Sequence, residues 1–231
     1  MKKFLVVLCA LTMMLSLCAC GSKDELVMAT NAEFPPYEYH EGEAIVGIDV
    51  EIAQAIANEM GRELVIEDMA FDSIIMAVTT GKADMGVAGL TITEDRLESV
   101  SFSIPYTTAA QVIIVKDGSD IASPDDLVGR TVGVQLGTTG DIYASDYEAE
   151  GSTIERYNKG ADAIQSLKQG KVDCVIIDNE PAKLLVEQNA NDIKMIDIAL
   201  TTEQYAYGVD KAQPELLGQY PQINRSVYCV I

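Results

Sequence analysis

The feature that most constrains the fold is a helix–turn–strand unit that occurs twice in the chain. One helix-like segment leads through Gly81-Lys82-Ala83-Asp84 into a strand ending near Gly89, and another leads through Gly170-Lys171-Val172-Asp173 into a strand ending near Asp178. In open α/β sheets ligands bind beyond the carboxyl ends of strands. The repeat therefore predicts two similar lobes with a ligand cleft between them, and the alternative is a coincidence, because the pattern is common after helices.

Strand-like and helix-like segments alternate along the chain, which favours an α/β fold with mixed sheets and helices on both faces. Strands are predicted over 26–30, 64–66, 85–88, 131–135, 172–177 and 204–209, with a Pro-rich loop over 31–40. Helices are predicted over 47–60, 73–80, 161–169 and 180–188, after Ser123-Pro124 and after 137–140. Asp72 and Ser123 are expected to be the N-caps of the helices that follow them. Asp49 lies in the first turn of the helix predicted over 47–60, where the helix dipole favours an acidic residue.

The N-terminus has the pattern of a secretory signal over residues 1–19. Lys2 and Lys3 precede an apolar run over 4–17 that is short for a membrane span. The segment Leu17-Cys18-Ala19-Cys20-Gly21-Ser22 resembles a bacterial lipobox, in which Cys20 carries the lipid. We therefore expect a lipidated linker over 20–25 and a protein anchored to the outer face of the cell membrane; the alternative is a short N-terminal anchor helix.

The composition argues against nucleic acids and anionic lipid surfaces as partners, and against a metal site. The formal net charge is -20, and removal of the signal makes it more negative by two, so nucleic acids and anionic lipid surfaces are repelled. Of the five cysteines, Cys174 and Cys229 remain after removal of the signal and lipidation of Cys20. Neither zinc-ligand spacing nor a disulfide framework is present, so no metal and no cofactor are expected.

The sequence offers the groups that a free amino acid needs. Its carboxylate favours a bidentate Arg and backbone N–H groups, and its ammonium favours a carboxylate. Arg96 and Thr91 follow one strand, Gly137-Thr138-Thr139-Gly140 begins a helix in the other half, and Asp178 ends a strand. Taken singly, Arg96 could be a surface salt-bridge residue and Asp178 a helix cap.

Aromatic side chains could flank the ligand's own side chain in such a pocket. Phe34, Tyr37 and Phe71 are the candidates, and each could equally be a core residue.

Several motifs in order resemble the polar amino-acid-binding proteins (solute-binding protein family 3) of bacterial ABC transporters. The resemblance runs from about residue 26 to about residue 217, over the segments TNAEFPPYEY (30–39), VGIDV (46–50), FDSII (71–75), AGLTITEDR (88–96), SFSIPY (101–106) and VQLGTTG (134–140). It implies a type II two-lobed periplasmic-binding-protein fold with crossovers near 107–110 and 202–206. It also implies lobe 1 over 26–108 plus 205–231, lobe 2 over 109–204, and a monomer that delivers its ligand to an ABC transporter permease.

The resemblance also assigns roles by position. Arg96 would hold the α-carboxylate with Thr91, Thr138 and Thr139, and Asp178 with the carbonyl of Gly89 would hold the α-ammonium. The predicted ligand site comprises Asn31, Phe34, Phe71, Ala88, Gly89, Thr91, Arg96, Gln135, Thr138, Thr139 and Asp178. Phe34 and Phe71 would enclose the side chain, whose tip would face Asn31, Glu33 and Gln135.

The C-terminus departs from the family pattern. Members normally end in a long amphipathic helix, whereas here Pro214-Glu215-Leu216-Leu217 is soon followed by Pro221, which would break that helix. A frameshift or early stop is one explanation. A truncated, nonfunctional copy is therefore one alternative function.

Other functions remain open beside a solute receptor for a polar amino acid. A dehydratase-like enzyme of the same fold needs a general acid or base in the cleft; the chain's only histidine, His40, lies in a loop away from the expected pocket, and Glu33 is the one acid that could serve. A sensory module would require a signalling domain that does not follow. No catalytic residue is predicted.

Overall fold

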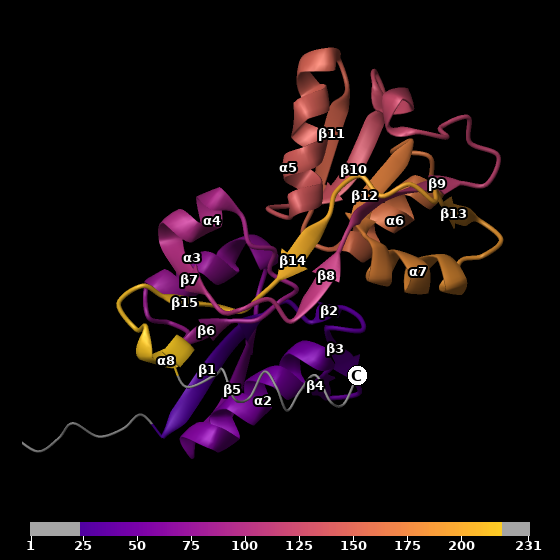
Figure 1. The fold of residues 1–231 in the computed structure, drawn as a ribbon. Coiled ribbons are helices and arrows are strands. Elements are labelled where there is room, and N and C mark those ends of the chain that lie inside the picture. The colour runs from indigo at the N-terminus through magenta and orange to yellow at the C-terminus, as the bar shows by residue number, and fades with distance from the viewer. Residues whose placement is uncertain (1–23, 219–231) are drawn as a thin grey trace, which may run out of the picture.

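The structure, a computed structural model, describes residues 24–218. The predicted signal peptide, the predicted lipidation site Cys20, and the tail from residue 219 with Pro221 lie outside the described residues. The described chain forms two lobes, each built on a five-stranded mixed sheet, and Figure 1 shows two strands running between them. The predicted α/β two-lobed fold is confirmed.

The first sheet has the strand order β5-β1-β6-β15-β7. Its strands are β1 (Glu25–Thr30), β5 (Glu63–Asp68), β6 (Met85–Gly86), β7 (Val100–Phe102) and β15 (Gly208–Asp210), and its helices are α2 (Ile48–Met60), α3 (Ile74–Thr79), α4 (Glu94–Ser99) and α8 (Glu215–Gly218). A small hairpin sheet, β2 (Glu33–Phe34), β3 (Glu38–Glu41) and β4 (Ala44–Val46), adjoins it, and η1 (Phe71–Ser73) is a 3-10 turn before α3.

The second sheet has the order β11-β10-β12-β9-β13. Its strands are β9 (Gln111–Lys116), β10 (Thr131–Gln135), β11 (Thr153–Tyr157), β12 (Cys174–Asp178) and β13 (Ile193–Met195). Its helices are α5 (Thr139–Ser145), α6 (Gly160–Lys168) and α7 (Asn179–Gln188), with 3-10 turns η2 (Pro124–Leu127) and η3 (Asp146–Glu150).

The internal repeat is present in three dimensions. In the first lobe the Asp84 N–H donates to the Val27 carbonyl at 2.8 Å, and the Asp84 carboxylate accepts from the Val27 N–H at 3.0 Å. In the second lobe Asp173 makes the same two hydrogen bonds to Thr131, both at 2.8 Å. In both lobes the strand that follows runs parallel to one neighbour and antiparallel to the other, so the two units occupy equivalent places.

Each sheet buries both faces because its strands carry apolar residues on both sides. On β1, Leu26 and Met28 pack into the cluster that contains Ile52 and Ile56 of α2, whereas Ala29 packs on the opposite face with α3. This alternation follows from the two-residue period of a strand. The predicted end of α2 is confirmed, because Gly61 adopts the left-handed conformation there.

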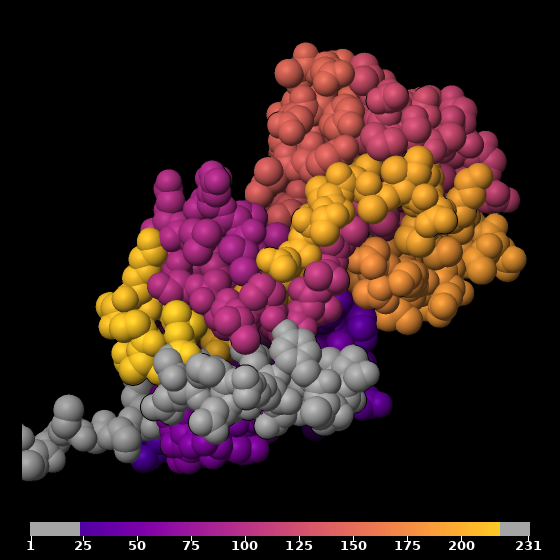
Figure 2. Space-filling model, viewed as in Figure 1, coloured from indigo at the N-terminus to yellow at the C-terminus, as the bar shows by residue number. Residues whose placement is uncertain are grey.

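Two crossover strands connect the lobes. β8 (Thr107–Ala109) carries the chain from the first sheet to the second, β14 (Glu203–Tyr205) carries it back, and the two pair antiparallel. In the space-filling view the returning segment is the orange-to-yellow band that leads from the second lobe to the first (Figure 2). Both crossovers lie where the resemblance implied them.

Two predicted elements are divided differently in the structure. The segment 31–40, predicted to be a loop, contains β2 and most of β3, which pair as a hairpin. The segment 204–209, predicted to be one strand, is split at Ala206 and Tyr207 between β14 and β15. The split is required because β14 pairs with a crossover strand while β15 joins the first sheet between two other strands.

Two helix starts also differ. Asp72 is wrong as the N-cap, because it lies inside η1, and α3 begins only at Ile74 without a side-chain cap. Ser123 does form a capping box with Asp126, but the turn that it caps is a 3-10 helix of four residues. Val128 leaves the helical region there and Gly129 has φ 73°, so the turn does not extend into an α-helix.

Candidate functional site: a cleft between the lobes

The predicted site residues line one pocket between the lobes. It encloses about 300 Å³ of space not filled by atoms and is lined by Asn31, Phe34, Glu38, Phe71, Ala88, Gly89, Thr91, Arg96, Gln135, Thr138, Thr139 and Asp178. All eleven predicted residues are among these twelve, and Glu38 is the addition. The first lobe contributes the residues up to Arg96, and the second contributes those from Gln135 onward.

Arg96 lines the pocket from the first lobe. Thr93 caps the short helix α4 that carries it, and the Arg96 side chain is largely buried. Its Nη1 donates to the Thr91 carbonyl at 2.8 Å, its Nη2 donates to the Gly137 carbonyl at 3.1 Å, and its guanidinium lies 5.3 Å from the centre of the Phe71 ring. Within residues 24–218 it makes no ion pair, which argues against a surface salt-bridge role.

Burial affects the pKa of Arg96. It lowers the pKa of the guanidinium, and the carboxylates of Glu203 and Asp178 oppose that effect. Because an Arg pKa starts so high, the group stays cationic. A buried cation without an ion-pair partner can bind an anion strongly, since water does not compete for it.

Asp178 lines the same pocket from the second lobe. It is the last residue of β12 and precedes α7, but its side chain makes no capping hydrogen bond, so the capping alternative is wrong. Instead the Tyr205 hydroxyl donates to Asp178 Oδ1. The pKa of Asp178 is raised to about 6, chiefly by burial and also by the Glu203 charge, while the hydrogen bond from Tyr205 acts in the opposite direction.

Gly89 is positioned by a pair of buried acids. Its φ is 53°, and a Cβ there would lie 3.0 Å from the Phe34 ring. Asp49 Oδ2 accepts from the Gly89 N–H at 2.8 Å and from the Tyr106 hydroxyl at 3.0 Å. Asp49 is thus fully buried and acts on the cleft, in addition to lying in the first turn of α2 as predicted.

Glu38 is the partner acid of Asp49. It is fully buried, and burial together with the Asp49 carboxylate raises its pKa well above the usual range. Asp49 itself has its pKa raised to about 6 by burial. Like charges that lie close together cannot both ionise easily, so the Asp49 carboxylate adds to the effect of burial on the pKa of Glu38.

The aromatic residues divide into two roles. Phe34 and Phe71 line the cleft, as predicted. Tyr37 does not line it; it stacks on Phe34 at 5.9 Å between ring centres and meets Tyr205 edge-on at 5.2 Å. Tyr37 therefore supports the pocket from the core.

Several contacts join the two lobes across the cleft. Gln135 Nε2 donates to Asn31 Oδ1 at 2.9 Å, and Lys159 pairs with Glu33 nearer the surface. A Cβ on Gly137, whose φ is 78°, would lie 3.0 Å from Cβ of Asp72 in the other lobe. The lobes are therefore in a closed arrangement.

Glu33 lies in a second, outer pocket instead of the cleft. This pocket is lined by Asn31, Glu33, Asp68, Met69, Ala70, Asn158 and Lys159, and it shares Asn31 with the cleft. Two of its residues are acidic and one is basic. His40 contacts Asp68 at 3.2 Å beside it, in agreement with the expectation that His40 lies away from the cleft.

Two functional residues were missed by sequence reasoning. Glu203 and Tyr205 lie on the crossover β14, and their side chains reach Thr91 and Asp178 from behind. The signal was present in the sequence as Glu203-Gln204-Tyr205 in the predicted crossover, where alternate residues share a face. That face could not be assigned before the partner strand was known.

No group of His, Cys, Asp and Glu within residues 24–218 is arranged to hold a metal ion. In the same residues, no helix combines the length and apolar character needed to cross a membrane.

The chain is similar to curated and solved amino-acid-binding proteins. It is 38% identical over 198 residues to the arginine-binding extracellular protein ArtP of Bacillus subtilis (strain 168), covering 82% of this chain and 78% of that protein. It is 33% identical to a probable histidine-binding protein of Neisseria gonorrhoeae, covering 80% and 70%. The solved structure of holo ArgBP from T. maritima superposes with a TM-score of 0.84 at 40% identity, covering 89% and 91%.

A family model extends these similarities to almost all of the described chain. Residues 26–220 match the model of the bacterial extracellular solute-binding proteins, family 3. The curated relatives are named as binding proteins, and the fold agrees with that of the solved structure. The chain belongs to the bacterial extracellular solute-binding proteins, family 3.

Proposed function

We propose that this protein is a non-enzymatic, monomeric receptor that captures one free L-amino acid with a cationic side chain, arginine first, and delivers it to an ABC importer. The observation that carries the proposal is that a buried, ion-pair-free Arg96 and a buried Asp178 line the same interlobe pocket. This arrangement matches the two charges of an amino acid backbone. Arg96 would hold the α-carboxylate, and Asp178 with the Gly89 carbonyl would hold the α-ammonium.

The acids around the cleft favour a cationic side chain. The ligand's carboxylate and ammonium account for Arg96 and Asp178, which leaves the outer acids Glu33 and Asp68 facing a single Lys159. A long side chain that passes Asn31, which lines both pockets, would reach these acids. Relatives named as arginine- and histidine-binding support a basic ligand.

A neutral polar ligand such as glutamine is the alternative. Asn31 and Gln135 are neutral, and they already bond each other at 2.9 Å. In such a complex the Glu33–Lys159 ion pair would stay intact, since a neutral tip offers no charge to replace it.

Thermal-shift measurements on residues 21–231 with each of the twenty amino acids test the proposal. A ligand that binds only the folded state at a thousandfold excess over its Kd stabilises the protein by about 4 kcal/mol. We expect arginine to give the largest rise in Tm. A clean unfolding transition that no amino acid shifts would refute the receptor function, and the absence of a transition would indicate a truncated copy that does not fold.

Two arginine analogues separate the charge contributions by calorimetry. Citrulline keeps the shape of arginine without the side-chain charge, so it should bind at least tenfold more weakly. Agmatine lacks the carboxylate that Arg96 would hold, so it should bind weakly as well. Equal binding of citrulline and arginine would favour the neutral-ligand alternative.

The enzyme alternative has little support from the cleft. Glu33, the acid that could have served as general base, lies in the outer pocket against Lys159. Glu38 does line the cleft, but no histidine or cysteine is among the twelve described residues of its lining that could act with it as a base or nucleophile. We therefore propose that ligand leaves the cleft unchanged, and product analysis by mass spectrometry after long incubation with arginine checks this.

We propose that the mature protein is anchored to the outer face of the cell membrane through a lipid on Cys20. The lipobox-like segment before it and the extracellular character of the family support this. Expression of the full chain and of Cys20→Ser in a bacterial host tests it. A labelled fatty acid supplied to the cells should be incorporated only into the unsubstituted chain, and its incorporation into both chains would contradict the assignment.

The proposed delivery step uses the two-lobed architecture. We propose lobe 1 over 26–108 plus 205–231 and lobe 2 over 109–204, joined at β8 and β14, with ligand shifting the open–closed equilibrium. The permease would then recognise the closed form. The division is supported by the two separate sheets and by the crossover pair between them.

A further inference from the structure

Glu203 lies at the junction of the two lobes and is one of the least exposed carboxylates in the described chain. It is 6% exposed, it belongs to the crossover strand β14, and its backbone pairs with Ala109 of the other crossover. A buried carboxylate requires compensation by donors, because desolvation of its charge is unfavourable. The identity of those donors shows what this carboxylate does.

Three threonine hydroxyls donate to Glu203. Thr91 donates to Oε2 at 2.6 Å, Thr139 donates to the same Oε2 at 2.8 Å, and Thr201 donates to Oε1 at 2.7 Å. These are short hydrogen bonds of the kind that hydroxyls make to an ionised carboxylate. The Thr139 hydroxyl also accepts from Gln111 Nε2 at 3.0 Å, so its proton is directed at Glu203.

The two donors on Oε2 come from different lobes. Thr91 follows β6 and hydrogen-bonds Arg96 through its carbonyl, whereas Thr139 begins α5 in the second lobe. The Oε2 atom of Glu203 therefore bridges the two lobes next to the place where the ligand's carboxylate is proposed to bind. Opening of the lobes about β8 and β14 would separate these hydroxyls and leave a buried carboxylate with one donor fewer.

From this geometry we propose that Glu203 is a positioning residue that stabilises the closed form by holding Thr91 and Thr139 on one carboxylate oxygen. The inference deepens the proposed receptor function, on which it rests. Ligand binding in the cleft and the Glu203 bridge then favour the same closed state. For a protein that binds ligand only when closed, the apparent Kd varies inversely with the closed fraction.

The bridge also fixes how Thr91 meets a ligand. Its hydroxyl proton is committed to Glu203, so Thr91 would serve the ligand's carboxylate through its backbone N–H alone. The position of Glu203 beside Arg96 and Asp178 gives its charge a second effect, since it raises the pKa of both groups.

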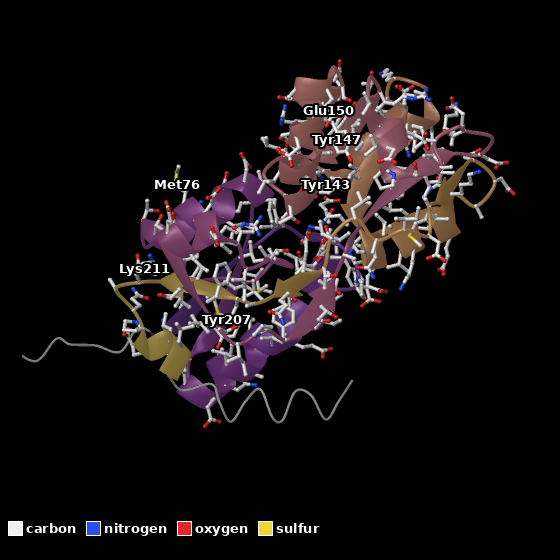
Figure 3. All side chains as sticks on the ribbon, turned by 45° about the horizontal axis from the view of Figure 1, so that its top comes forward. Met76, Tyr143, Tyr147, Glu150, Tyr207 and Lys211 are labelled. Carbon is white, nitrogen blue, oxygen red and sulfur yellow. The ribbon has the colours of Figure 1, made fainter. Side chains whose placement is uncertain are left out.

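Interlobe distance in the ligand-free protein is the primary test. The measurement uses residues 21–231 carrying Cys229→Ser, with dyes on Met76→Cys and Glu150→Cys. Figure 3 shows these two positions on the outer surfaces of the first and second lobes, so energy transfer between the dyes reports closure. We expect the unsubstituted protein to populate the closed distance, and Glu203→Ala to lower the closed-to-open ratio tenfold or more. Glu203→Gln should fall between them, because an amide oxygen still accepts both hydroxyls.

Matched variants separate the bridge from a general effect on folding. Thr139→Val should open the lobes, Thr139→Ser should restore closure, and Glu155→Ala, an exposed acid of the same lobe, should change nothing. The Kd for L-arginine should weaken by the factor by which the closed fraction falls. If Glu203→Ala lowers Tm but leaves both the interlobe distance and Kd unchanged, the residue is only structural and the proposal is overturned.

The two proposals fail in different ways. If the unsubstituted protein binds no amino acid, the receptor function fails, while the ligand-free distances still test Glu203. If arginine binds but Glu203→Ala shows the same ligand-free distances as the unsubstituted protein, the bridge fails and the receptor function stands.

Discussion

Tyr205 donates a hydrogen bond from its hydroxyl to Asp178 Oδ1, joining the returning crossover to the end of β12 in the second lobe. Both residues are buried, and Tyr205 also meets the Tyr37 ring that supports Phe34. The carboxylate proposed to bind the ligand's ammonium is therefore oriented by a strand that connects the two lobes.

Tyr205→Phe should weaken ligand binding and shift its pH dependence. The hydrogen bond from Tyr205 opposes the effect of burial on Asp178, so its loss should raise the pKa of Asp178 further. We expect about tenfold weaker arginine binding at pH 7, equivalent to about 1.4 kcal/mol, measured by calorimetry. Tyr147→Phe is the control, since Tyr147 lies in η3 (Figure 3) and is not among the twelve cleft residues; equal losses in both variants would contradict the assigned role.

The affinity for an amino acid should fall as the pH decreases through about 6. The pKa of Asp178 is raised to about 6, and the protonated form cannot pair with an ammonium group. Calorimetric titrations between pH 7.5 and pH 5 would show this. An affinity that stays constant over that range would exclude Asp178 as the ammonium-binding group.

Stability of the ligand-free protein should change in the opposite direction. Asp49 and Asp178 have raised pKa values when folded, so between the unfolded value near 4 and the folded value of about 6 the native state binds more protons. The contribution of these two acids to the free energy of unfolding therefore increases as pH falls from 7 towards 4. Denaturant unfolding of Asp49→Asn and Asp178→Asn should show a smaller increase over this range than the unsubstituted protein.

Arg96→Ala should abolish most of the binding of arginine. Loss of a buried, charge-assisted contact to a carboxylate is expected to weaken binding by about 2–5 kcal/mol. Agmatine, which has no carboxylate, should bind both proteins equally. Arg130→Ala, which removes an Arg paired with Asp120 on the second lobe, should leave arginine binding intact.

Gly137→Ala should impair closure more than it impairs folding. Gly137 and Gly151 both have positive φ, so either substitution introduces backbone strain of about 1 kcal/mol. A Cβ on Gly137 would press on Asp72 of the other lobe at 3.0 Å, whereas a Cβ on Gly151 would meet nothing within 4 Å. Only Gly137→Ala should therefore weaken ligand binding; equal Kd values for the two variants would show that this interlobe approach is unimportant.

Cys174 should not react with thiol reagents while the protein is folded. It is fully buried, and burial raises the pKa of its thiol to about 12. In residues 21–231 with Cys229→Ser, a disulfide-exchange reagent should modify Cys174 only after denaturant is added. Fast modification of the native protein would mean that the second lobe opens around β12.

The sequence by itself determined the repeat, the alternation of elements and the motif order. These are local properties: Gly81 and Gly170 each adopt a left-handed conformation before a strand, and Asp84 and Asp173 each bond the neighbouring strand in the same way. They were sufficient to predict two lobes and a cleft whose lining includes Arg96.

Only the tertiary structure shows which residues contact and support the residues that line the cleft. Glu203, Tyr205 and Glu38 act on the cleft through contacts between residues far apart in the chain, such as the 112 residues between Thr91 and Glu203. Asp49 and Glu33 were visible in the sequence, but only the fold placed the first beneath Gly89 and the second in the outer pocket. Burial and the pairing of crossover strands set these roles, and neither is encoded in the spacing of residues along a single segment.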